Sequence, residues 1–283
     1  MIIGTSDSVR MIVDEECAME TKRKMTLEVC VESVESALAA KAGGATRLEL
    51  CANLVIGGTT PGYALFEQVK KETQLPVRVL IRPRFGDFLY TEYEYQQMCC
   101  DIRYFAQAGA DGVVIGSLKE DGSLNEEQMQ GMIDAAGKCG ITLHRAFDVC
   151  ADPIVTLQKT AELGIDTILT SGQEADCLAG RRLLRHLVHL TDENMEEPFE
   201  KKCRQTILVG AGVNASNIAE IVAETGARAF HMSGKKILSS GMCYRNERVH
   251  MGVEGLSEFE IYRTDKEEIR RAAQILNKLF IRK

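Results

Sequence analysis

Short apolar segments alternate along the chain with longer segments whose apolar residues recur at helical spacing. The apolar segments are rich in Val, Ile and Leu, which is typical of parallel strands that are buried on both faces. On this pattern we predict eight strands, at residues 26–31, 47–51, 77–83, 112–116, 141–147, 167–171, 206–210 and 229–233.

The intervening segments predict helices at residues 33–42, 63–73, 94–108, 125–138, 152–163, 176–190 and 216–225, with 266–280 closing the chain. Several end in "GGA", "AGAD", "LGID" or "TGAR", where Gly supplies a left-handed cap. Eight alternating units predict an α/β fold, a single TIM-type (β/α)8 barrel over residues 25–283. The alternative is an open doubly wound sheet, but no GxGxxG fingerprint follows Cys30. Residues 1–24 have no clear period and are expected to form an N-terminal extension of uncertain order.

Two neighbouring strands repeat a Leu-Glu-x-Cys pattern, as "TLEVC" and "RLELC". Side chains alternate along a strand, so Glu28 and Cys30 share one face while the apolar residues between them share the other. The apolar face has to meet the helices, and the acid and the thiol are therefore predicted to point into the barrel. The same parity predicts two further inward residues, Glu49 and Cys51.

Polar residues gather at the carboxyl ends of the other predicted strands: Arg82, Arg84, His144, Arg145, Asp148, Thr170, Ser171, His231 and Ser233. We expect His144 and Asp148 to share one face of their strand. Ionisable groups without partners are costly in a dry core, so such a set must form ion pairs or face a wet cavity. One structural alternative is an ion pair between Glu28 and Arg82. As a set, these residues predict a functional site at the C-terminal mouth of the barrel.

Two glycine-containing loops are candidate anion binders. "LVGAGVNASN" places Gly210 and Gly212 after the seventh strand, and "HMSGKK" places Ser233 and Gly234 after the eighth. Backbone N–H groups in these loops of a barrel often bind phosphate. The alternative is that the glycines only make tight turns.

Composition narrows the possible partners. The 283 residues carry a formal net charge of -7, and no basic run is interleaved with aromatic residues, which argues against nucleic acid. We find no membrane-spanning run and no signal peptide, so we expect a cytoplasmic protein with no membrane partner. The ten cysteines show no CxxC spacing and are expected to be reduced. An acidic insertion, 191–202, follows a helix, whereas a second insertion, 239–264, follows a strand and is expected at the C-terminal face.

Taken in order, these motifs resemble the CutC family of copper homeostasis proteins. The resemblance runs from about Met25 to Leu238 through "EVCVESVESALAAKAGGATRLELCANLVIGGTTPG", "IRPRFGDFLYTEYE", "DGVVIGSLKEDG", "LHRAFD", "ILTSG" and "VGAGV". It implies a TIM-type barrel, a cytosolic location, a homo-oligomer and a Cu(I) site at Cys30 and Cys51. Thiolates suit Cu(I) because both are soft.

The same mouth also fits an enzyme that acts on a small anionic or phosphorylated metabolite. In this hypothesis Glu49, His144 and Asp148 are the candidate catalytic groups. The substrate or anion would be bound by residues from Glu28, Arg82, Arg84, Arg145, Gly210, Gly212, Ser233 and Gly234. A divalent metal on the carboxylates is a variant of this hypothesis. No Lys lies within a predicted strand, which disfavours Schiff-base chemistry.

Overall fold

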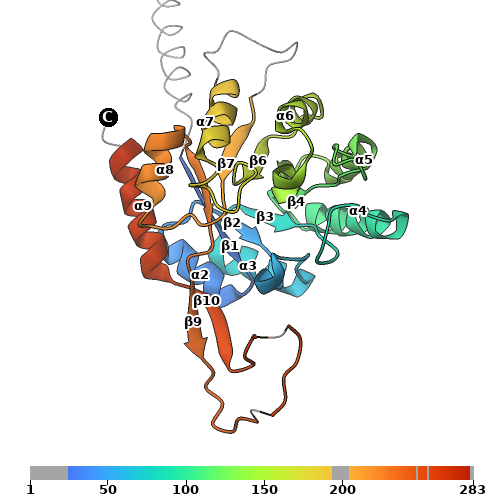
Figure 1. The fold of residues 1–283 in the computed structure, drawn as a ribbon. Helices are drawn as coiled ribbons and strands as arrows, with labels where there is room; N and C mark the ends of the chain where they lie inside the picture. Colours follow the sequence, from blue (N-terminus) through green and yellow to red (C-terminus); the bar gives the residue numbers. More distant parts are fainter. Residues whose placement is uncertain (1–24, 193–203, 247, 254, 281–283) are drawn as a thin grey trace, which may run out of the picture.

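A closed barrel of eight parallel strands forms the centre of the molecule (Figure 1). The computed structural model describes residues 25–192, 204–246, 248–253 and 255–280, so the predicted extension 1–24 and most of the acidic insertion lie outside the described residues. The barrel strands are β1 Thr26–Val31, β2 Arg47–Leu50, β3 Val77–Leu80, β4 Gly112–Ile115, β5 Gly140–Leu143, β6 Thr167–Thr170, β7 Thr206–Val209 and β8 Ala229–Met232. Pairing of β1 with β8 closes the sheet, which confirms the TIM-type barrel and excludes the open sheet.

Helices surround the barrel (Figure 1). They are α2 Val34–Gly43, α3 Tyr63–Thr73, α4 Glu92–Gln107, α5 Glu126–Ala136, α6 Pro153–Glu162, α7 Arg181–Leu190, α8 Ile218–Thr225 and α9 Lys266–Phe280, with 3-10 turns η1 Leu54–Ile56 and η2 Arg145–Val149. Local signals set their ends. The Ser33 hydroxyl accepts a hydrogen bond from the Ser36 N–H at the start of α2, and Gly44, with φ of 100°, ends it.

Alternation of side chains separates two kinds of core. Leu27, Val29 and Val31 of β1 are fully buried in the large apolar layer between strands and helices. The barrel interior holds two small apolar clusters, made of Cys30, Cys51, Leu80 and Val114, and of Leu169, Leu208 and Ala229. The predicted facing of Glu28, Cys30, Glu49 and Cys51 follows from the same alternation, because Cys30 pairs with Glu49 across the first two strands.

Two strands end at least three residues earlier than the sequence predicts. β3 stops at Leu80 and β5 at Leu143, three and four residues before the predicted ends. After β5, the His144 Nδ1 accepts a hydrogen bond from the Ala146 N–H at 3.1 Å and starts η2. The chain therefore turns instead of continuing as a strand, and the expectation that His144 and Asp148 share a strand face is wrong.

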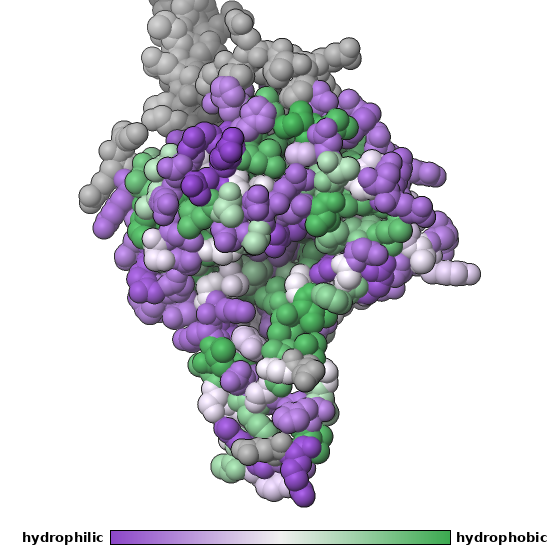
Figure 2. All heavy atoms as spheres, in the orientation of Figure 1, coloured by the Kyte–Doolittle hydropathy of each residue, from purple (hydrophilic) through white to green (hydrophobic). Residues whose placement is uncertain are grey.

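The insertion after β8 forms an antiparallel hairpin of β9 Lys235–Ser239 and β10 Glu260–Thr264. The hairpin projects from the C-terminal side of the barrel, and Figure 2 shows apolar side chains scattered among polar ones along it. Its base is held by a hydrogen bond from the Thr264 N–H to the Ser36 hydroxyl, 3.2 Å long. In the described part of the chain, no helix is long and apolar enough to cross a lipid bilayer.

Close packing inside the barrel gives a test of the fold. At Gly112 on β4, an added Cβ would lie 2.7 Å from the carbonyl oxygen of Gly140 and 2.9 Å from the side chain of Arg78. We predict that Gly112→Ala lowers the free energy of unfolding by about 1–3 kcal/mol, because neither backbone can move aside without cost. Urea denaturation measures the loss. The control is Gly241→Ala, which has open space around it and should stay within about 0.5 kcal/mol of the unsubstituted protein; equal effects would contradict the packing.

Candidate functional site

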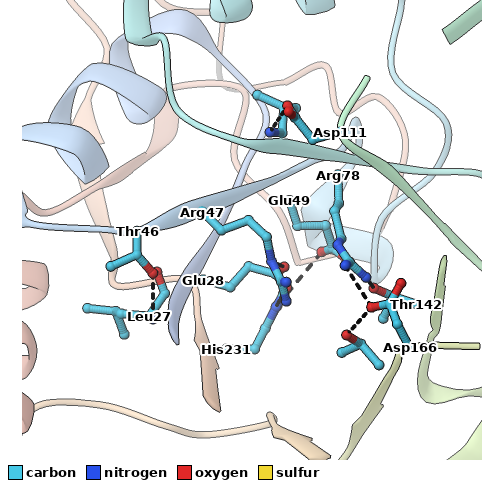
Figure 3. Close-up of polar contacts among 12 residues, drawn as sticks. Leu27, Glu28, Thr46, Arg47, Glu49, Arg78, Asp111, Thr142, Asp166 and His231 are labelled. Carbon is cyan, nitrogen blue, oxygen red and sulfur yellow. Dashed lines mark hydrogen bonds and ion pairs between the residues drawn. The ribbon is translucent and has the colours of Figure 1, made fainter. Parts of the chain in front are cut away.

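A buried carboxylate links three strands at the point where the barrel closes. Glu28 of β1 is fully buried and lies opposite Arg47 on β2 and His231 on β8. Its two oxygens are used separately: Oε2 accepts from the Arg47 Nε at 2.5 Å, and Oε1 lies 2.8 Å from the His231 Nδ1 (Figure 3). The ion pair between Glu28 and Arg82 that the sequence suggested is therefore wrong.

The charge state of Glu28 fixes the imidazole of His231. Burial alone would raise the pKa of Glu28, but Arg47 and the His231 hydrogen bond outweigh it and lower the pKa to about 2. The ionised carboxylate accepts the hydrogen of His231 Nδ1. Nε2, the other ring nitrogen, is thereby directed away from Glu28.

Three potential metal ligands meet above this pair. One ligand atom from each of Cys30, Glu49 and His231 lies within 4.8 Å of the others. His231 Nε2 is 3.8 Å from Glu49 Oε2. Burial favours the neutral ring, but Cys30 and Glu49 outweigh it and hold the pKa of His231 well above its usual range. These neighbours therefore favour a positive charge on or beside the His231 imidazole.

Cys51 lies deeper than Cys30. Its thiol is fully buried and donates to Glu49 Oε2 at 3.3 Å. Burial and the neighbouring Glu49 raise the pKa of Cys51 well above its ordinary value, and burial also raises that of Glu49. Cys30 and Cys51 share one apolar cluster inside the barrel, but the three-residue group above does not include Cys51.

A cavity of about 840 Å³ opens over the C-terminal ends of the strands. This volume is in the range of small-molecule sites. Of the residues singled out in the sequence, it is lined by Cys30, Glu49, Arg82, His144, Arg145, Asp148, Gly212, His231, Ser233 and Gly234. The other predicted site residues, Glu28, Cys51, Arg84 and Gly210, are not part of its lining. The structure thus brings most of the predicted set to one mouth.

Arg84 and Gly210 contribute to the walls around this site. Arg84 forms ion pairs with Glu94 at 2.5 Å and Asp87 at 2.9 Å, which hold the loop between β3 and α4. Gly210 faces the barrel interior, where an added Cβ would lie 2.6 Å from the Leu169 side chain. Close packing explains the glycine at this position.

Asp148 organises the loop that follows β6. Its carboxylate accepts from the Thr170 hydroxyl at 2.5 Å, from the backbone N–H groups of Ser171 and Gln173, and from the Arg145 Nε at 2.6 Å. The acceptor capacity of the carboxylate is used by these four donors. This geometry favours a structural role for Asp148 and Arg145 in shaping the cavity wall.

Two interior residues belong to the network although the sequence analysis gave them no role. They are Arg47 and Arg78. Arg78 donates to the Thr142 hydroxyl at 2.5 Å and pairs with Asp166 at 2.7 Å below the cavity (Figure 3). Strand parity carries the missing signal, because Arg47 alternates with outward Leu48 just as Glu49 does.

The fold and the site together define the class of protein. It is a parallel α/β barrel that carries a cluster of thiol, carboxylate and imidazole groups at its C-terminal mouth. The family model described as "CutC family" matches residues 25–236. The chain therefore belongs to the CutC family, whose relatives carry copper homeostasis names, as the sequence resemblance predicted.

The relatives extend over most of the chain. A family protein CutC of Parabacteroides distasonis is 45% identical over 249 residues, covering 87% of this chain and 98% of the relative. The human copper homeostasis protein cutC homolog is 38% identical over 256 residues, covering 90% of each. The crystal structure of the putative copper homeostasis protein CutC from Streptococcus agalactiae superposes with a TM-score of 0.67 at 28% identity, covering 74% of this chain and 98% of that one.

Removing the Glu28 charge tests the buried network. We predict that Glu28→Gln lowers the free energy of unfolding by about 3–5 kcal/mol, because Arg47 and His231 are left buried without their anion. The measurement is urea denaturation at neutral pH. As a control, Glu267→Gln removes one partner of an exposed pair with Arg270 and should cost less than about 1 kcal/mol. Comparable losses in the two variants would show that the network contributes no more than a surface pair.

The burial of His144 predicts a dependence of stability on pH. Burial and the charge of Arg82 lower its pKa to about 3, whereas in the unfolded chain it is about 6.5. Below the unfolded pKa the unfolded state takes up the proton first, so stability falls as the pH drops from 6.5 toward 3. Compared with His144→Phe, which cannot titrate, the unsubstituted protein should lose up to about 1.4 kcal/mol per pH unit in this window. If the free energy of unfolding changes equally with pH in the two proteins, this prediction is refuted.

Proposed function

We propose that the protein handles copper in the cytoplasm and binds a copper(I) ion at the mouth of the barrel. Cys30 and His231 are the principal ligands, and Cys51 supplies a further thiol from below. The copper homeostasis names of the relatives support the choice of metal. The homo-oligomer implied by the family stays a prediction.

The observation that carries the proposal is the hold of Glu28 on His231. Histidines that bind metals usually donate their other ring hydrogen to a carboxylate, which fixes the ring and makes the ligating nitrogen more basic. Here an ionised, fully buried carboxylate accepts from Nδ1, and Nε2 faces the group that contains Cys30. A neutral acceptor at Nδ1 would make Nε2 less basic and would support a metal site less strongly.

The donor set suits a soft ion that can be loaded and released. Cu(I) prefers thiolate and imidazole over carboxylate. Cys30 is 7% exposed and lines the cavity, so an ion can reach it from the mouth. Glu49 lies beside both ligands and balances the positive charge of the ion. A site open to a cavity is suited to exchange of copper with a partner, in contrast to a closed structural site.

Anaerobic titration of the full chain against a chromogenic Cu(I) chelator tests this function. We predict that Cys30→Ser and His231→Asn each lower the affinity by more than about a hundredfold, because each removes a ligand, and that Glu28→Gln lowers it about 10- to 100-fold through the imidazole. The matched control is Cys100→Ser, which removes an exposed thiol on α4 and should bind as the unsubstituted chain does.

Cys51→Ser separates the two thiols. Because Cys51 lies outside the three-residue group, its loss should weaken binding less than the loss of Cys30. Unchanged affinity in Cys30→Ser would overturn the proposed site. A larger loss in Cys51→Ser than in Cys30→Ser would overturn the assignment of the principal ligands.

A further inference from the structure

Two hydrogen-bond donors in the cavity lining have no partner, and neither belongs to the copper cluster. They are the Arg82 Nε and the His144 Nε2, both buried and both without a hydrogen bond among the described residues. The side chains that carry them line the cavity. Buried donors are nearly always satisfied in folded proteins, so two in one cavity indicate that an absent group meets them.

Arg82 carries a charge that the described residues leave without a counter-ion. The residue is 8% exposed. Its terminal nitrogens donate to the carbonyl oxygens of Gly57, Gly58 and Gly86, at 3.4, 3.2 and 2.8 Å. Carbonyl dipoles solvate a guanidinium in part, but a buried charge without an ion-pair partner stays costly. These bonds also hold the guanidinium in place and leave Nε as its one nitrogen without any hydrogen-bond partner among the described residues.

His144 is held as a neutral hydrogen-bond donor. Its Nδ1 accepts the Ala146 N–H at 3.1 Å, which places the ring hydrogen on Nε2. The lowered pKa of His144, caused by burial and by Arg82, keeps the ring neutral at physiological pH. Nε2 therefore offers a hydrogen and accepts none.

One aromatic ring brings the two donors to the same wall. The Arg82 guanidinium carbon lies 5.1 Å from the centroid of the Phe88 ring, and the His144 ring centroid lies 4.7 Å from it. Phe88 also lines the cavity, together with Leu54, Val55 and Ile56. The two donors thus lie beside apolar surface, where a hydrogen bond to an anion is stronger than in water.

We propose that the cavity binds a small oxyanionic metabolite whose carboxylate or phosphate oxygens accept hydrogens from Arg82 Nε and His144 Nε2. A metal cation is excluded at this position because both groups are donors. An anion supplies the missing charge as well as the missing acceptors, which a neutral ligand does not. This inference goes beyond copper binding and uses residues outside the copper cluster.

Calorimetric titration of the full, copper-free chain tests the proposal with three probes of similar size. They are malonate for a carboxylate, glycerol 3-phosphate for a phosphate ester, and glycerol as the neutral control. At least one of the two anions should bind saturably and raise Tm, while glycerol does neither. The anion that binds more tightly identifies the class. If neither anion binds better than glycerol, the proposal is overturned.

Variants assign the binding to this wall. Arg82→Gln and His144→Phe should each weaken anion binding at least tenfold. The control is Arg185→Gln, which removes an exposed arginine paired with Glu224 outside the cavity lining and should leave anion binding unchanged. Far-UV circular dichroism checks that each variant is folded. If Arg82→Gln unfolds, His144→Phe alone tests whether the anion binds at this wall. Anion binding that survives in His144→Phe, or that Arg185→Gln reduces equally, would refute the assignment.

Copper titration of the same variants keeps the two proposals distinguishable. Cys30→Ser should lose copper and keep the anion, and His144→Phe should lose the anion and keep copper. If the copper pattern fails while the anion pattern holds, only the copper proposal is overturned. The reverse result overturns only the anion proposal.

Discussion

The position of Glu28 between Arg47 and His231 is the interaction on which the site depends. β1, the first strand, pairs with β2 on one side and with β8, the last strand, on the other. The two carboxylate oxygens of Glu28 bond to residues on these two neighbouring strands, one to Arg47 of β2 and the other to His231 of β8. Three ionisable groups in a core are tolerated only when they satisfy one another. The pairing therefore stabilises the closure of the barrel and, through the same hydrogen bond, orients the imidazole beside Cys30.

Two parts of the cavity lining differ in their chemistry. A thiol, an imidazole and a carboxylate meet next to the buried network, and this set suits a soft metal. Arg82 and His144 lie on another part of the lining beside Phe88 and offer hydrogens to an acceptor. The same opening therefore leads both to groups that suit a soft metal ion and to groups that donate hydrogen bonds to an acceptor. This explains why hard and soft residues coexist at the mouth of a protein whose relatives carry copper homeostasis names.

Strand parity could be predicted from the sequence because it depends only on neighbouring residues. It gave the inward facing of Glu28, Cys30, Glu49 and Cys51, and the number of units gave the barrel. Register could not be predicted, because it depends on the stagger of eight strands together. For this reason the sequence is compatible with an ion pair between Glu28 and Arg82, whereas Arg47 and His231 lie opposite Glu28 in the barrel.

Loop geometry was equally inaccessible. The turn at His144 depends on a hydrogen bond to Ala146, and the direction of Arg84 depends on Glu94, ten residues away in the chain. Neither contact has a periodic signature. Sequence reasoning could therefore indicate the end of the barrel where the cavity opens, but it could not separate the residues that line the cavity from those that support its walls.

X-ray absorption at the copper edge of the Cu(I)-loaded full chain tests the central claim most directly, because it reads the ligand atoms themselves. The account predicts sulfur together with an imidazole nitrogen in the first coordination shell, with the imidazole signal lost in His231→Asn. A shell without imidazole, or one that is the same in His231→Asn, would show that Glu28 does not orient a copper ligand.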